Sequence, residues 1–174
     1  MPDAPEIPEA TDPFEKRVAI SIAVLAVMLS FIGNLGDNAK TDSILKTNEA
    51  TNRWGYFQAK SIKGQMAAMQ GAMLAAVSGA QPDEARTKEI ARLKAEAERY
   101  AQEKEEIEKH AKELQAEAAQ DSKVNDRCDH ASLMLQIAVV ICSVAILSRW
   151  HAFWFAGLAL GVAGAATGAT AFFM

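Results

Sequence analysis

The chain has 174 residues, half of them hydrophobic and 23% charged, with a formal net charge of −4 at pH 7. Charged and apolar residues are segregated along the sequence, which excludes a single uniform globular domain. No block is basic enough to form the concentrated Lys/Arg face that nucleic-acid binding needs, so no nucleic-acid partner is expected. The two cysteines, Cys128 and Cys142, lie too far apart along a straight helix to form a disulfide within the chain.

An acidic segment that contains several prolines opens the sequence. Residues 1–17 carry five acids against Lys16 and Arg17, and they have little apolar surface to bury. This composition predicts a disordered N-terminal tail over residues 1–17. The segment lacks the basic start and small-residue cleavage site of a secretory signal, so the basic pair before Val18 indicates an uncleaved signal anchor.

Three stretches are apolar and long enough to predict membrane-spanning helices. Such a helix needs ~20 apolar residues, because each residue adds 1.5 Å along a path of ~30 Å. The predicted spans are residues 18–36, 133–148 and 152–173, with a tight turn between the last two. The lipid bilayer is therefore the first expected partner. Since the spans contain no Asp, Glu, Lys, Arg or His, an ion-coupled pump is not expected.

Residues 37–132 predict two long helices that turn near residues 79–83, where a glycine precedes a proline. The first arm of this hairpin is net positive and the second is net negative, which favours antiparallel pairing. The first arm also carries an apolar stripe at helical spacing, flanked by alanines and a glycine. The stripe consists of Met66, Met69, Met73 and Val77.

The second arm contains a heptad repeat. Its apolar positions alternate in steps of three and four residues, which is typical of a coiled coil. The expected fold is therefore all-α, with three transmembrane helices and a long antiparallel coiled-coil hairpin between the first and second. The predicted seam consists of Ile90, Leu93, Ala97, Tyr100, Lys104, Ile107, Ala111, Leu114 and Ala118.

The third span carries small residues four positions apart. Small side chains at this spacing let another helix backbone approach closely in lipid. We interpret the face as a site of self-association, which makes a homo-oligomer the expected state. The alternative is packing against the other two spans of the same chain. The residues concerned are Gly157, Gly161, Gly164, Ala165 and Gly168.

A cluster of aromatic residues surrounds a glycine in the otherwise polar first arm. Aromatic residues and arginine are enriched at interface hot spots. The functional interpretation is a docking site for an unidentified protein partner, or an oligomer contact. The alternative is packing against the other arm. The cluster consists of Arg53, Trp54, Gly55, Tyr56 and Phe57.

The asparagine- and aromatic-rich stretch at residues 48–63 lies between an N-terminal span, a charged coiled coil and two C-terminal spans. This arrangement resembles the bacterial membrane proteins grouped as domain of unknown function 4337. The resemblance covers nearly the whole chain beyond the acidic tail. It supports the topology, and because the family has no assigned activity it implies no catalytic residue.

No residue pattern indicates catalysis or a cofactor. Asp126, Cys128, Asp129 and His130 do not match a metal-ligand spacing, so no metal site is expected. The favoured function is a non-enzymatic integral membrane protein that self-associates through its transmembrane helices and projects the hairpin as a scaffold or interaction arm. The alternative is a subunit of an oligomeric channel, or an accessory subunit of a membrane complex.

The short basic flanks predict the orientation. In a three-span topology Lys16, Arg17 and Arg149 lie on one side of the membrane, and positive residues in short loops favour the cytoplasm. We therefore expect a multi-pass protein of the bacterial inner (cytoplasmic) membrane. Its N-terminus would be cytoplasmic and its hairpin periplasmic.

Overall fold

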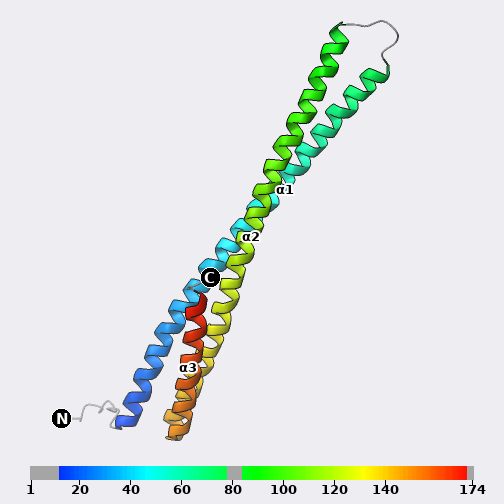
Figure 1. Ribbon diagram of the computed structural model, residues 1–174. Helices are drawn as coiled ribbons and strands as arrows, with labels where there is room; N and C mark the ends of the chain where they lie inside the picture. Colours follow the sequence, from blue (N-terminus) through cyan, green and yellow to red (C-terminus); the bar gives the residue numbers. More distant parts are fainter. Residues whose placement is uncertain (1–11, 78–83, 172–174) are drawn as a thin grey trace, which may run out of the picture. The chain divides into compact units, whose positions relative to one another are not determined.

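The structure, a computed structural model, describes residues 12–77 and 84–171. They form three helices, α1 (Pro13–Ala76), α2 (Glu84–Ser148) and α3 (His151–Ala171) (Figure 1). These residues contain no strand, as expected for an all-α fold. Each helix includes a segment long and apolar enough to cross a membrane. The predicted tip at residues 79–83 and the last residues of the predicted third span, 172–173, lie outside the described part of the chain.

The chain forms two compact units, and α1 and α2 contribute to both. The first unit comprises Met1–Asp42 and Gln120–Met174, and we call it the three-helix unit because α3 packs there against α1 and α2. The second comprises Ser43–Ala119, and we call it the two-helix arm. All three apolar segments predicted to span a membrane belong to the three-helix unit.

The first helix begins earlier than the composition of the tail predicted. The Phe14 N–H donates to Asp12 Oδ1 at 2.9 Å, so Asp12 caps the helix. Pro13 follows at the first helical position, where its missing N–H needs no partner. Residues 13–17 are therefore helical, and the prediction of disorder was wrong for them. Residues 1–11 of the predicted tail lie outside the described residues.

Two glycines of α3 allow its backbone to approach α2 closely. A Cβ placed on Gly157 would lie 2.5 Å from Cys142 Sγ and 3.1 Å from the carbonyl oxygen of Ala138. A Cβ placed on Gly164 would lie 3.2 Å from the carbonyl oxygen of Ala131. Because backbone oxygens cannot move aside as a flexible side chain can, these two positions require glycine for the observed approach.

Two further glycines of α3 face α1 in the three-helix unit. A Cβ on Gly161 would lie 2.5 Å from Leu25 Cδ2, and a Cβ on Gly168 would lie 2.6 Å from Ile32 Cδ1. Ala165, between them, is partly buried. All four glycines are thus covered by helices of the same chain, which is the alternative that the sequence left open.

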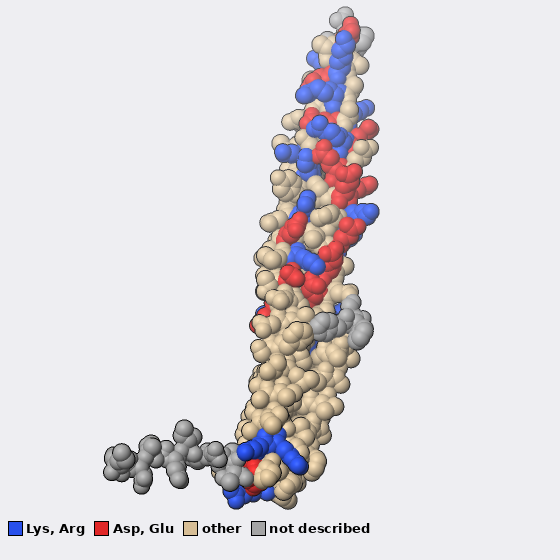
Figure 2. Space-filling model, turned by 90° about the vertical axis from the view of Figure 1, so that its left-hand side faces the viewer, with Lys and Arg blue, Asp and Glu red and all other residues tan. Residues whose placement is uncertain are grey.

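Charged side chains lie at both ends of the three-helix unit and are absent from the segments between. At one end Arg149 Nη2 pairs with Glu15 Oε1 at 3.1 Å, which ties the α2–α3 connection to the start of α1. At the other end Arg127 Nη1 donates to Thr170 Oγ1 at 3.3 Å. Figure 2 shows a band without charged side chains over this unit. The surface of the unit therefore suits a surrounding of lipid.

The close approach at Gly157 gives a testable prediction. Gly157→Ala should lower the stability of the three-helix unit by ~1–3 kcal/mol, because the added methyl group meets a backbone oxygen. Gly33→Ala is the matched control, since a Cβ there meets nothing within 4 Å and alanine favours a helix. Thermal unfolding in detergent compares the two variants. Equal melting temperatures would contradict the observed packing.

Candidate interaction surface of the helical arm

The two helices of the arm run antiparallel and are joined by ion pairs in one register. Lys46 Nζ lies 3.2 Å from Glu117 Oε2, and Lys60 Nζ lies 2.5 Å from Glu103 Oε2. The two lysines are 14 residues apart on α1 (46 to 60), and the two glutamates are 14 apart on α2 (103 to 117). The two helices of the hairpin carry opposite net charges in the sequence. Those charges form specific ion pairs between α1 and α2.

Small residues fill most of the contact between α1 and α2 in the arm. A Cβ on Gly64 would lie 3.3 Å from Tyr100 Cβ, and a Cβ on Gly71 would lie 3.5 Å from Leu93 Cβ. Ala67 is buried beside them. None of the residues predicted as the coiled-coil seam is exposed; these are Ile90, Leu93, Ala97, Tyr100, Lys104, Ile107, Ala111, Leu114 and Ala118.

The predicted aromatic cluster divides between two faces of α1. Trp54 and Phe57 are partly buried, with ring centroids 5.3 Å apart in an edge-to-face arrangement. The Lys104 ammonium of α2 lies 5.5 Å from the centroid of Phe57. Phe57 therefore contacts α2, and Trp54 packs against Phe57. Gly55 is exposed, and a Cβ there would meet nothing within 4 Å, so no close approach among the described residues requires this glycine.

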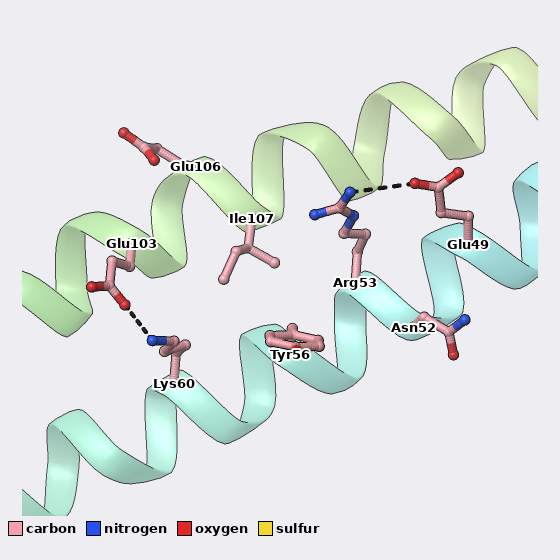
Figure 3. A pocket seen from close by; sticks show the side chains of 8 residues that line it. All are labelled: Glu49, Asn52, Arg53, Tyr56, Lys60, Glu103, Glu106 and Ile107. Carbon is pink, nitrogen blue, oxygen red and sulfur yellow. Dashed lines mark hydrogen bonds and ion pairs between the residues drawn. The ribbon is translucent and has the colours of Figure 1, made fainter.

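The other two members of the cluster line an open groove of about 510 Å³ between α1 and α2. Tyr56 is 66% exposed, and Arg53 Nη2 pairs with Glu49 Oε1 at 3.3 Å. Figure 3 shows Ile107 pointing from α2 toward α1. The groove offers an exposed ring and charges of both signs to a partner. Its lining residues are Glu49, Asn52, Arg53, Tyr56, Lys60, Glu103, Glu106 and Ile107.

Lys60 contacts two side chains of α2 at one end of this groove. Its ammonium donates to the Glu103 carboxylate and lies 5.1 Å from the centroid of the Tyr100 ring. The hydrogen bond from Lys60 lowers the pKa of Glu103 below its ordinary value, and the positive charge of Lys60 adds to this effect. The contact therefore favours the ionised carboxylate at neutral pH.

A second surface of the arm was not singled out from the sequence as a site. Five apolar side chains, between 51% and 77% exposed, follow one another along the outer face of α1, the last of them one residue beyond its end. We call them the methionine stripe. Its members are Ile62, Met66, Met69, Met73 and Val77.

The methionine stripe faces outward because the small residues on the opposite side of α1 face α2. Gly64, Ala67 and Gly71 occupy the contact, at the spacing of three and four that a heptad requires. The alternation of these small residues is the signal in the sequence that could have identified the outward face. Four members of the stripe were recognised as periodic, but their exposure was not predicted.

The residues considered as metal ligands belong to the three-helix unit and make other contacts. Cys128 is buried, and a Cβ on Gly36 would lie 2.8 Å from its Cβ. Asp129 accepts a hydrogen bond from Asn125. Within residues 12–77 and 84–171 no three His, Cys, Asp or Glu side chains form a group that could hold a metal ion.

Comparison with protein families identifies the chain's relatives. A family profile matches residues 14–174, which include almost all of α1 and the whole of α2 and α3. The chain belongs to the family described as Domain of unknown function (DUF4337). The family expected from residues 48–63 and the order of the spans is thereby confirmed. No curated protein and no solved structure matches the chain.

Reversing one charge of the arm should loosen it. Lys60→Glu places a second carboxylate against Glu103, so we expect a lower melting temperature and faster proteolysis of the arm. Adding Glu103→Lys should restore part of the loss. Lys88→Glu is the control, because Lys88 pairs with Glu84 of its own helix and is largely exposed. Equal effects of Lys60→Glu and Lys88→Glu would show that the ion pair between α1 and α2 contributes nothing to the stability of the arm.

The arm should also lose stability in acid. Because folding lowers the pKa of Glu103, its stabilising contribution is complete above the ordinary carboxyl pKa of 4.5 and disappears as the pH falls through the lowered value. The melting temperature of Glu103→Gln should therefore fall less on acidification than that of the wild type. The exposed Glu105→Gln serves as control. A Glu103→Gln profile parallel to the wild type over this range would contradict the assignment.

Proposed function

We propose that this member of the DUF4337 family is a non-enzymatic membrane protein that self-associates and projects its coiled-coil hairpin as a scaffold or interaction arm. Three helices long and apolar enough to cross a membrane support the anchoring role. The observation that carries the interaction role is the methionine stripe on the outer face of α1.

The methionine stripe is unusual for a surface that water surrounds. Exposed apolar side chains that are contiguous, rather than scattered, mark interaction sites. The stripe begins 26 residues beyond the end of the predicted first span (36 to 62), which corresponds to ~39 Å of α1. The stripe therefore belongs to the two-helix arm and lies outside all three predicted spans. Methionine side chains adapt to differently shaped partners, which suits an interaction arm.

We place the N-terminus in the cytoplasm and the arm in the periplasm of a bacterial cell, with the protein in the inner membrane. The ion pair between Arg149 and Glu15 supports this placing, because it brings the α2–α3 connection to the end of the three-helix unit that carries Lys16 and Arg17. The basic flanks therefore gather at one end, the pattern found on the cytoplasmic side.

Self-association is tested by the mass of the full chain. We expect a defined oligomer both in mild detergent and in lipid nanodiscs, measured by mass photometry. A uniform monomer in both media would overturn self-association.

The interaction role of the arm is tested separately by photo-crosslinking in intact cells. A crosslinking amino acid at Met69 should give one discrete adduct, and the same group at the exposed Gln102 of α2 should not. Met66→Gln and Met73→Gln together should weaken the Met69 adduct by removing apolar contact on either side. Equal adduct patterns at positions 69 and 102 would overturn this role.

A further inference from the structure

A strongly polar side chain lies on the outer, apolar surface of the three-helix unit. Gln136 is in the predicted second span, and its residue is exposed rather than packed against α1 or α3. The apolar residues Leu133, Ile137 and Val140 surround it on the same surface and are also exposed. Among the residues that the structure describes, none forms a hydrogen bond with the Gln136 amide.

Gln136 lies within the predicted second span. An unpaired amide at this depth raises the free energy of the protein in a membrane. The charged residues nearest to it in the sequence are Asp129 of α2 and Arg149, one residue beyond the end of α2. They lie seven and thirteen residues away, or ~10 Å and ~20 Å at the rise of an α-helix. A glutamine amide has two N–H donors and one oxygen acceptor. In hydrocarbon no water satisfies them, so a partner must be supplied by protein.

Other polar side chains in the apolar segments form hydrogen bonds with backbone carbonyl groups of their own helix. Ser143 Oγ donates to the carbonyl oxygen of Val139 at 2.9 Å, and Thr167 Oγ1 donates to that of Ala163 at 2.9 Å. Gln136 makes no such bond. One helical turn away, Ser132 Oγ is buried without a hydrogen-bond partner. Within the part of the chain that the structure describes, the Gln136 amide and the Ser132 hydroxyl therefore lack hydrogen-bond partners.

We infer that a second copy of this chain covers the Gln136 face of α2, with the Gln136 amides of the two copies bonded to each other. The inference rests on the proposed self-association and names its surface. An amide both donates and accepts, so it is self-complementary across a two-fold axis. Copies anchored in the same membrane with the same orientation hold Gln136 at the same depth. Hydrogen bonds between polar side chains of neighbouring helices are a known mode of association in lipid.

The surface around Gln136 suits such a contact. Val140, Ser143 and Leu147 follow it in steps of four, three and four residues, so all four lie on one stripe of α2, and all are exposed. The small Ser143 permits close approach of a facing helix. The α3 glycines are covered within the chain, so the contact between copies moves from α3 to α2.

The test measures association of the full-length protein in liposomes over a range of protein-to-lipid ratios, by single-molecule photobleaching. Gln136→Leu should weaken association by about 5- to 30-fold, the effect of losing interhelical hydrogen bonds. Gln136→Asn keeps an amide and should retain most of it. Val162→Leu, on an exposed position of α3, is the matched control and should change nothing.

Cysteine crosslinking provides a second, independent measurement. In a background with Cys128→Ala and Cys142→Ala, Val140→Cys should form a disulfide between copies on mild oxidation. Val162→Cys should not. Both replaced cysteines are buried and become smaller, and unchanged mass and helicity of the background protein verify that it folds.

The outcomes separate the inference from the proposed function. A self-associating wild type whose equilibrium is unchanged by Gln136→Leu would overturn the α2 contact and leave self-association standing. A wild type that remains monomeric at every protein-to-lipid ratio would overturn both. Crosslinking through position 162 but not 140 would also overturn the α2 contact.

Discussion

The structure depends on close approach between helix backbones at positions with small side chains. In the three-helix unit the contact faces of α2 and α3 are built from residues such as Ala131, Ala138, Ala145 and Gly157. In the arm, alanines and glycines again occupy much of the contact. Small side chains let two helices lie close together, so that van der Waals contacts extend along their whole length.

This way of packing places large apolar side chains on the outside. In the three-helix unit Phe31, Val140 and Phe155 are exposed, and a bilayer is a favourable surrounding for them. In the arm the same rule exposes the methionine stripe, which lies outside the predicted spans. The two units therefore follow one packing principle with different consequences.

Much of the fold could be predicted from the sequence because the signals are local. Long runs without charge predicted the three spans, and the alternation of steps of three and four identified positions of α2, such as Leu93 and Tyr100, that are not exposed. The start of α1 was missed although its signal was present. Asp12 followed by Pro13 is a good helix start, but the acidic, proline-containing composition around it outweighed two residues.

The faces of the helices were harder to predict than the helices themselves. The methionine stripe and the small residues Gly64, Ala67 and Gly71 both recur at helical spacing. Only the position of α2 decides which of the two sets is buried. The glycines of α3 posed the same problem. Small residues four apart serve contacts within a chain and between chains equally well, so spacing alone does not name the partner.

The exposed thioethers of Met66, Met69 and Met73 have a chemical consequence. Peroxide and related oxidants reach sulfur on such a surface and convert it to the sulfoxide. The sulfoxide is polar, so oxidation would remove the apolar character of this face and leave the inward contacts of Gly64 and Gly71 untouched. The outer face of the arm is thus sensitive to oxidation in a way that its inner face is not.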